Sequence, residues 1–252
     1  HTKEVQLQVN QILDQVNVMR DALETLNPDE AGSNKYMADS VDYNKFYPTG
    51  LYIGDKDDKF AGADGWTPPD DFITYERGWY KEGVLSDKMT FGEPYIDANT
   101  GAYCVTAGGR LTLQGYNVPV LAVDIYLEDI STMVGKYKII ENGKSMLIYH
   151  GKDKDIVMAY SDKKTIGTEL SKYNEKEILG NISGTIKNMA GTAEIKSING
   201  ENYYLVANKI ENCDWVVVSY VSEAEVLAKL NQLGLIAIFL MVGGIIIVGV
   251  VI

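Results

Sequence analysis

Six residues in the first half of the sequence have the chemistry that a pocket for a small zwitterion requires. They comprise one guanidinium group, two carboxylates and three aromatic rings: Arg77, Trp79, Tyr80, Tyr95, Asp97 and Asp124. A guanidinium group can fork onto a carboxylate, and carboxylates can neutralise an ammonium group. Aromatic faces can flank the cation and exclude water from it. These residue types therefore predict a site that holds both ends of a small zwitterion.

Asp124 is the strongest single candidate because of the residues around it. It ends the apolar run 120–123, where a charge is costly unless a partner is provided. A second apolar run, 215–218, is followed by Ser219, so the fold does not require a carboxylate at this position. We therefore assign Asp124 to ligand binding, and we expect the second half of the chain not to bind the same ligand.

A structural role competes with ligand binding at Arg77. Three acidic residues lie close to it in the sequence: Asp71, Glu76 and Glu82. A salt bridge to one of them would be the ordinary role of an isolated arginine. The aromatic residues around Arg77 and its spacing from the other motifs favour ligand contact instead.

The remaining candidates also have two interpretations each. Trp79 and Tyr80 are adjacent at the start of a predicted helix and point in different directions, so at least one of them should belong to the core. Tyr95 and Asp97 share one face of a predicted strand. However, residues 97–101 are also typical of a hairpin turn, in which the aspartate would bond to its own backbone.

The composition argues against several classes of function. The chain has 35 acidic and 23 basic residues and no basic cluster, which disfavours nucleic acid as a partner. His1 and His150 are the only histidines, so we expect no metal site, no cofactor and no enzymatic activity. The only two cysteines, Cys104 and Cys213, are far apart, and we expect two free buried thiols rather than one disulfide.

A long helix is predicted at the N-terminus, from Thr2 to Leu26, ended by Asn27 and Pro28. Its apolar residues follow a heptad: Val5, Val9, Ile12, Val16, Met19, Leu23 and Leu26. This pattern suits a helix that packs on its own domain, and it also suits the seam of a homodimer. We expect a homodimer through this helix.

The rest of the chain contains a repeated plan of strands and helices. Three segments of the first half have counterparts in the second: 51–57 resembles 148–154, 101–105 resembles 200–204, and 120–124 resembles 215–219. Such repetition predicts two α+β modules, each an antiparallel sheet with flanking helices. We divide the chain into the helix 1–33, a first module 34–140, a second module 141–221 and a C-terminal helix 222–252.

The C-terminal segment predicts attachment to a membrane. Leu233 to Ile252 runs for twenty residues without a charge, and at about 1.5 Å per residue it would cross the roughly 30 Å of a hydrocarbon core. The alternative is a buried hydrophobic helix, which the glycines at 243 and 244 and the density of Ile and Val disfavour. We expect further chain on both sides of the sequence.

The sequence resembles the tandem (double) Cache domains, which are extracytoplasmic sensors of bacterial chemoreceptors, sensor kinases and cyclic-nucleotide enzymes. The most similar segments are 77–82, 91–101 and 121–125. The resemblance implies an α+β fold with a long N-terminal helix, two stacked PAS-like modules and a C-terminal transmembrane helix. It also implies that ligand binds in the membrane-distal module, residues 34–140.

One subset of this family recognises free amino acids through an Arg-x-Trp-Tyr motif, a Tyr-x-Asp motif and a later aspartate. The sequence is similar at each of these points. By this resemblance Arg77 and Trp79 would hold the carboxylate of the ligand. The ammonium group would be held by Tyr80, Tyr95, Asp97 and Asp124.

Two departures from the subset concern the first motif. Phe72 stands where the subset often has a tyrosine, so a hydroxyl contact to the ligand is absent there. Gly78 stands where proline is common. Phe72 and Tyr75 are further candidates for the wall of the pocket.

These observations lead to one functional expectation and four alternatives. We expect a non-enzymatic sensor domain, attached to the cell membrane on its extracytoplasmic side, that binds a free L-amino acid and transmits the signal of a chemotaxis receptor or similar protein. A sensor of amines is disfavoured by Arg77, and a sensor of carboxylic acids by the two aspartates. A passive dimerising stalk does not require Asp124, and an extracytoplasmic hydrolase lacks a histidine base.

Overall fold

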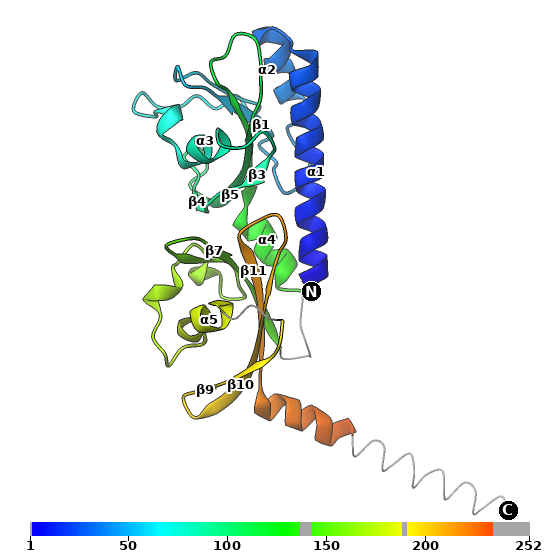
Figure 1. Ribbon diagram of the computed structural model, residues 1–252, viewed down its shortest axis with the longest axis vertical. Coiled ribbons are helices and arrows are strands. Elements are labelled where there is room, and N and C mark those ends of the chain that lie inside the picture. Colours follow the sequence, from blue (N-terminus) through cyan, green and yellow to red (C-terminus); the bar gives the residue numbers. More distant parts are fainter. Residues whose placement is uncertain (1, 137–142, 188–190, 234–252) are drawn as a thin grey trace, which may run out of the picture.

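Two α+β modules stack one above the other beside a single long helix (Figure 1). This computed structural model describes residues 2–136, 143–187 and 191–233. The upper, distal module contains the first half of the chain, and the lower, proximal module contains the second half. Both modules contribute buried side chains to one hydrophobic cluster that runs along the helix. The predicted fold of a long helix and two sheet modules is confirmed.

Helix α1, Thr2–Leu26, has the predicted bounds and ends at Asn27, whose φ is +40°. The heptad residues Val5, Val9, Val16 and Leu23 are fully buried in the chain's own core. The interpretation of the heptad as a face packed on its own domain is therefore confirmed. Because these side chains are covered, they are not available as the seam of a homodimer.

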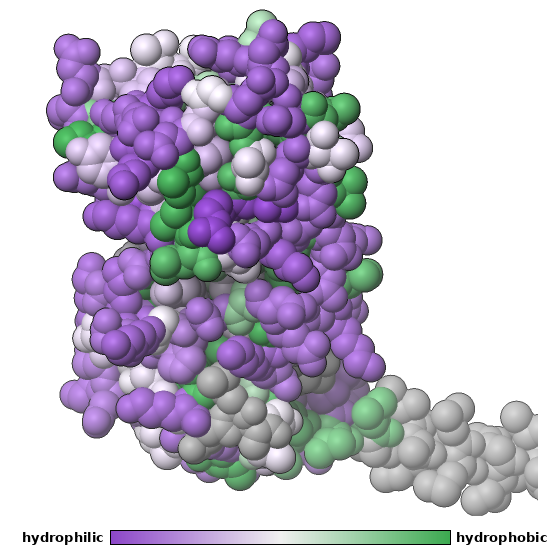
Figure 2. Space-filling model, turned by 45° about the horizontal axis from the view of Figure 1, so that its top comes forward, coloured by the Kyte–Doolittle hydropathy of each residue, from purple (hydrophilic) through white to green (hydrophobic). Residues whose placement is uncertain are grey.

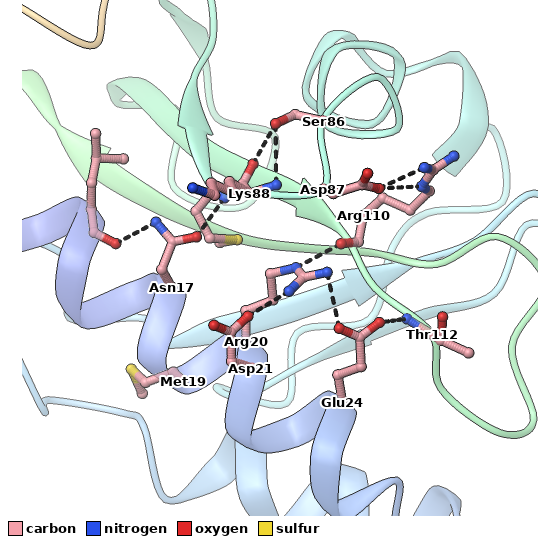
Figure 3. Close-up of polar contacts among 12 residues, drawn as sticks. Asn17, Met19, Arg20, Asp21, Glu24, Ser86, Asp87, Lys88, Arg110 and Thr112 are labelled. Atoms are coloured by element: carbon pink, nitrogen blue, oxygen red, sulfur yellow. Dashed lines mark hydrogen bonds and ion pairs between the residues drawn. The ribbon is translucent and has the colours of Figure 1, made fainter.

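Polar contacts fix α1 to the edge of the distal module (Figure 3). The buried guanidinium of Arg20 donates from Nε to the carbonyl oxygen of Arg110, 2.6 Å away, and forms an ion pair with Glu24. The other oxygen of Glu24 accepts from the backbone amide of Thr112 at 2.6 Å. Asn17 accepts from the backbone amide of Met89 at 2.9 Å. These bonds hold the helix against the sheet that carries the cavity described below.

The distal module is one antiparallel sheet between two helical layers. The chain enters it through α2, Glu30–Ala38. The sheet order is β2-β1-β6-β5-β3, with β4 also pairing to β5. The strands are β1 Leu51–Gly54, β2 Phe60–Gly62, β3 Thr90–Phe91, β4 Tyr95–Ile96, β5 Tyr103–Arg110 and β6 Val120–Tyr126. Helix α1 covers one face, and α3, Gly78–Gly83, covers the other after the short turn η1, Thr74–Glu76.

The proximal module repeats this topology. Helix α4, Leu127–Val134, leads into a sheet of order β8-β7-β11-β10-β9. Its strands are β7 Lys144–His150, β8 Asp155–Ala159, β9 Glu194–Ile198, β10 Glu201–Lys209 and β11 Trp215–Ser222. Helix α5, Ile178–Lys187, and the turns η2, Lys163–Thr165, and η3, Leu170–Lys172, stand where the distal module has α3 and η1. The predicted internal repeat is confirmed.

The predicted equivalence of Asp124 and Ser219 is wrong by one residue. Strand residues alternate between the faces of a sheet, and Asp124 shares the α3 face of β6 with Val120 and Ala122. The corresponding face of β11, which packs on α5, carries Val216, Val218 and Tyr220. Both Asp124 and Tyr220 also lie three residues before the helix that follows their strand. Tyr220 is therefore the counterpart of Asp124, and the repeat still has no carboxylate there.

The two modules are joined by direct side-chain contacts as well as by the shared core. The ring of Phe91 in β3 stacks on Trp215 in β11, with centroids 4.5 Å apart. Lys154 of the proximal module forms an ion pair with Glu93 of the distal module at 2.5 Å. Movements of the distal sheet can therefore reach the strand that ends the proximal module.

The C-terminal part of the structure is a helix over residues 223–233, directly after β11. Its exposed leucines contribute hydrophobic surface next to the grey residues in Figure 2, on an otherwise largely hydrophilic face. Among residues 2–136, 143–187 and 191–233, no helix is long and apolar enough to cross a membrane. The predicted span 233–252 lies, apart from its first residue, outside this part of the chain.

Candidate functional site

Most of the predicted site residues meet in one cavity on the α3 side of the distal sheet. Residues from β1, β2, α3, β4 and β6 and from the connecting loops form its walls. The predicted residues among them are Phe72, Arg77, Trp79, Tyr95, Asp97 and Asp124. The space open to the centre of a water molecule is about 40 Å³, enough for roughly three waters. Five separate segments of the sequence therefore converge on one small space.

Asp124 lies at the inner end of this cavity with one carboxylate oxygen fully engaged. Its Oδ1 accepts hydrogen bonds from the hydroxyls of Thr106 at 2.5 Å, Tyr52 at 2.8 Å and Tyr95 at 3.1 Å. Its Oδ2 accepts no hydrogen bond from the part of the chain that the structure describes. An ionised carboxylate has acceptor sites on both of its oxygens, and those of Oδ2 are left open here. The carboxylate is thus fixed in position and keeps one oxygen for a further donor.

Burial raises the pKa of Asp124 from 3.8 to about 6. The hydroxyls of Thr106 and Tyr52 oppose this rise, and the nearby charge of Asp97 adds to it. No positively charged side chain forms an ion pair with Asp124 within the described ranges. The negative charge of this carboxylate is therefore not neutralised by the described part of the chain, and a bound cation would neutralise it.

Arg77 reaches the same cavity and has no carboxylate partner among the residues that the structure describes. It immediately precedes α3, and its guanidinium lies over the ring of Phe72, 4.8 Å from the centroid. The alternative of a salt bridge to Asp71, Glu76 or Glu82 is therefore wrong. Glu82 instead accepts from the backbone amide of Glu93. The guanidinium is left with its hydrogen-bond donors available to a ligand.

Aromatic rings form much of the cavity wall. Tyr52 packs edge-to-face against Trp79, with centroids 4.9 Å apart. Phe60, Trp66 and Phe72 contact one another edge-on, at centroid distances of 5.4 to 5.8 Å. These rings exclude water from the charged groups and strengthen electrostatic attraction inside the cavity.

Asp97 lines the cavity, but its carboxylate is already occupied by the adjacent turn. Its Oδ1 accepts from the backbone amide of Asn99 at 3.1 Å. Its Oδ2 accepts from the amide and hydroxyl of Thr100 at 2.9 and 2.6 Å. The structural interpretation of Asp97 as a turn residue accounts for these bonds, and its influence on a ligand is mainly through its charge.

Two of the predicted residues lie outside the cavity: the ligand-binding candidate Tyr80 and the wall candidate Tyr75. Tyr80 is buried, meets the ring of Trp79 edge-on at a centroid distance of 6.0 Å, and donates to the carbonyl oxygen of Val118 at 2.8 Å. Both rings belong to the hydrophobic cluster on this face of the sheet, and only Trp79 also lines the cavity. Tyr75 is 41% exposed and does not line the cavity.

Sequence reasoning missed several residues that complete the site. Tyr52 and Thr106 supply hydroxyls to Asp124, and Phe60, Trp66 and Tyr126 line the cavity. Thr106 is the cross-strand partner of Asp124 in the β5–β6 pair. The two predicted strands contained this signal, but the register of their pairing was needed to use it.

Neither a cluster of metal-ligating residues nor a reactive thiol is found in the described part of the chain. Within the described ranges, no group of three or more His, Cys, Asp or Glu is placed to hold a metal ion. Both cysteines are free, as predicted, with Cys104 buried and Cys213 half-buried. Burial raises the pKa of both thiols, that of Cys213 to about 12, so both are unreactive at neutral pH.

Known proteins match this chain in sequence and in fold. Residues 16–132, a little under half of the chain, match the family described as the methyl-accepting chemotaxis protein-like first PDC sensor domain. Methyl-accepting chemotaxis protein TlpA of Bacillus subtilis is 32% identical over 121 residues, which are 48% of this chain and 17% of TlpA. The chain spans between 17% and 30% of the length of the curated relatives that it matches.

Solved structures share the whole two-module arrangement. The ligand-binding domain of the Pseudomonas fluorescens chemoreceptor CtaA, in complex with L-isoleucine, has a TM-score of 0.71 at 19% identity, and 90% of each chain is covered. That of the Pseudomonas aeruginosa amino acid chemoreceptor PctC, in complex with GABA, has a TM-score of 0.68 at 18% identity, covering 87% of this chain and 94% of that one.

The family match and the fold agree on one class of protein. The matched family consists of sensor domains and not of enzymes, so the expectation of a non-enzymatic binding domain is confirmed. The resemblance to tandem Cache domains is also confirmed, because two PDC modules follow one long helix. Residues 16–132 match the first PDC sensor domain of methyl-accepting chemotaxis protein-like receptors, and the chain as a whole has the dCache-type fold of two such modules after one long helix.

Proposed function

We propose that this chain is the extracytoplasmic sensor of a membrane receptor and that its distal cavity binds a free L-amino acid. One observation carries this proposal: Asp124 and Arg77 line the same cavity, and neither has an oppositely charged partner in the described part of the chain. A buried charge is favourable only when it is matched. A zwitterion matches both charges at once, whereas an amine or a carboxylic acid matches only one.

Each end of the amino acid has a defined set of contacts. The ammonium group donates to Oδ2 of Asp124 and lies beside the hydroxyl of Tyr95, with the charge of Asp97 nearby. The carboxylate is held by the guanidinium of Arg77 and lies against Trp79. The solved relatives support this class of ligand, since CtaA was crystallised with L-isoleucine and PctC with GABA.

Ligand closure would be transmitted along β6 and across the contact between the modules. Tyr126, at the end of β6, lines the cavity and immediately precedes α4. The stack of Phe91 on Trp215 links the distal sheet to β11, which continues into helix 223–233. A displacement of about 1–2 Å is the typical scale of such switches. Residues 233–252 would carry this movement into the membrane.

A homodimer, if it forms through α1, must use the outward face of this helix. The heptad residues Val5, Val9, Ile12, Val16 and Leu23 are buried in the chain's own core, whereas Leu7 and Val18 are 55% and 69% exposed. We therefore propose the face that carries Leu7 and Val18 as the contact surface of a homodimeric receptor. Cross-linking of a cysteine at position 18 would test this contact in the membrane.

The proposed ligand class is tested by titration calorimetry of the protein with L-amino acids, amines and small carboxylic acids. We expect heat from one or a few L-amino acids and none from matched amines or acids. The Asp124→Ala and Arg77→Ala variants should remain folded by circular dichroism and lose this binding. Binding of simple amines or acids alone, or unchanged affinity in both variants, would reject the zwitterion assignment.

A further inference from the structure

The proximal module has its own open groove on the face that corresponds to the distal cavity. Helix α5 covers this side of the sheet (Figure 1). Residues of α5 line the groove, and the space open to the centre of a water molecule is about 620 Å³. Tyr220, the counterpart of Asp124, lines it. We propose that this groove is a second binding site, which takes a small organic cation, either an amine or a quaternary ammonium compound.

Tyrosine rings form the walls of the groove. The four that line it are Tyr160, Tyr173, Tyr203 and Tyr220. Tyr203 and Tyr220 meet edge-to-face, with centroids 6.2 Å apart. Aromatic faces attract organic cations through the ring quadrupole, and several faces around one space recognise ammonium groups.

A pair of hydrogen-bonded tyrosine hydroxyls lies in the groove, one from the buried Tyr220 and one from the half-buried Tyr160. Tyr220 is only 6% exposed, and its hydroxyl is hydrogen-bonded to that of Tyr160. Neither hydroxyl has another hydrogen-bond partner in the described part of the chain. One hydroxyl of the pair donates to the other, so the hydrogen of the accepting hydroxyl and the unused lone pairs of both oxygens remain available. A bound ammonium group or its hydration water would supply the missing donors.

The charges around the groove select for a cation. Four carboxylates line it, against a single ammonium group from Lys144: Asp162, Glu177, Glu201 and Glu225. None of the four forms an ion pair within residues 2–136, 143–187 and 191–233. The hydroxyl of Tyr203 donates to Glu201 at 2.8 Å, which places this carboxylate beside the aromatic wall. The groove has no arginine, in contrast to the distal cavity, so an amino acid carboxylate would meet only the single ammonium group of Lys144 among four carboxylates.

The groove also touches the start of the C-terminal helix. Ser222, the last residue of β11, and Glu225, in the first turn of helix 223–233, both line it. The hydroxyl of Ser222 accepts from the backbone amide of Glu225 at 3.2 Å. A cation bound beside Glu225 would act directly on this helix, without passing through the distal module.

The test is titration calorimetry of the 252-residue chain in detergent with tetramethylammonium chloride and with 1,4-diaminobutane, against sodium chloride of equal ionic strength. We expect saturable binding of at least one of these cations. The Glu201→Gln, Glu225→Gln double variant should weaken it by about tenfold or more. The Tyr203→Leu variant should weaken it as well. Both variants change half-exposed or exposed side chains and should keep the circular dichroism spectrum of the parent.

Two controls separate this site from its alternatives. A matched double variant, Glu30→Gln with Glu211→Gln, removes two exposed carboxylates outside the groove and should leave cation binding unchanged. The Asp124→Ala variant should also leave it unchanged, because the distal cavity is not involved. Absence of saturable binding, equal loss in the matched control, or loss in Asp124→Ala would each overturn the proposal.

Discussion

At the scale of single residues, Asp124 dominates the behaviour of the ligand-free protein. Its pKa is about 6 in the folded chain and 3.8 in the ordinary unfolded environment. Between these values the folded state binds more protons than the unfolded state, so this group makes stability fall as pH rises. A difference of about two pKa units corresponds to a loss of about 3 kcal/mol in the free energy of unfolding. This destabilisation is fully present above pH 6 and absent below pH 4.

The Asp124→Asn variant should therefore stabilise the ligand-free protein. The amide oxygen can still accept from the hydroxyls of Thr106, Tyr52 and Tyr95, but no charge is buried. We expect a gain of up to about 3 kcal/mol at pH 8 and little change at pH 4, measured by urea denaturation of both proteins. The same variant should lose at least about a hundredfold in amino acid affinity. An unstable variant would mean that Asp124 is a structural ion.

The affinity of the wild-type protein for its amino acid should depend on the same proton. Bound ammonium favours the charged carboxylate, so protons compete with the ligand below the pKa of Asp124, about 6. We expect a constant dissociation constant from pH 7 to 8 and a loss approaching about tenfold per pH unit below 6. Calorimetric titrations across this range measure it, and a flat profile down to pH 5 would remove Asp124 from the site.

Arg77 should behave differently from Asp124, because it supports no contact that folding needs. Within the described part of the chain, its guanidinium forms no ion pair and packs over the ring of Phe72. The Arg77→Lys variant keeps the charge but loses the fork of parallel donors, so we expect a loss of about ten- to a hundredfold in affinity. The midpoint of thermal unfolding without ligand should shift by less than about two degrees. A large drop in that midpoint would indicate a structural role.

At the scale of elements, α1 offers a direct comparison between two residues of one heptad. Leu23 is fully buried, and Leu26, three residues later, is 66% exposed. The Leu23→Ala variant should cost about 2–5 kcal/mol of stability, and Leu26→Ala less than about 0.5 kcal/mol. Denaturation of the monomeric protein measures both. Equal, concentration-dependent losses would instead assign the heptad to a homodimer.

The elements also show how far sequence reasoning reaches. The heptad and the Asn27–Pro28 stop determine α1 locally, so its bounds were predictable. The two modules were predictable because the apolar runs occur twice in the chain. Each run is too apolar for the surface and is therefore expected to form a buried strand. The short strand β3 was not predicted, since two residues contain no periodic signal. Strand β4 lies in the predicted strand segment 95–97, but the pairing of both short strands to β5 depends on the folded sheet.

The residues alone predicted the candidate site best where a charge stood out against its surroundings, and the family resemblance added Phe72, Trp79 and Tyr95. Arg77 and Asp124 are charges in aromatic and apolar segments, and both reach the cavity. The polar contacts of Asp124 come from other strands, and their positions depend on register. The same dependence explains the error at Ser219, because a shift of one residue moves a strand side chain to the opposite face.

At the scale of the whole molecule, the contact between the modules must carry any signal from the distal cavity to helix 223–233. The ring of Phe91 stacks on Trp215, and the ion pair between Glu93 and Lys154 lies at the same junction. An exposed ion pair of this kind contributes little, whereas a buried aromatic stack contributes about 0.5–1.5 kcal/mol beyond its buried area. The stack should therefore dominate the coupling.

Hydrogen exchange of the amides in β11 measures this coupling. In the wild-type protein, a saturating amino acid should slow exchange in both β6 and β11. In the Phe91→Ala variant the slowing should persist in β6 and largely disappear from β11, while affinity changes by less than about threefold. The Lys154→Gln variant serves as the control and should keep both effects. If β11 responds equally in Phe91→Ala, the signal travels instead through α4, the other connection between the two sheets.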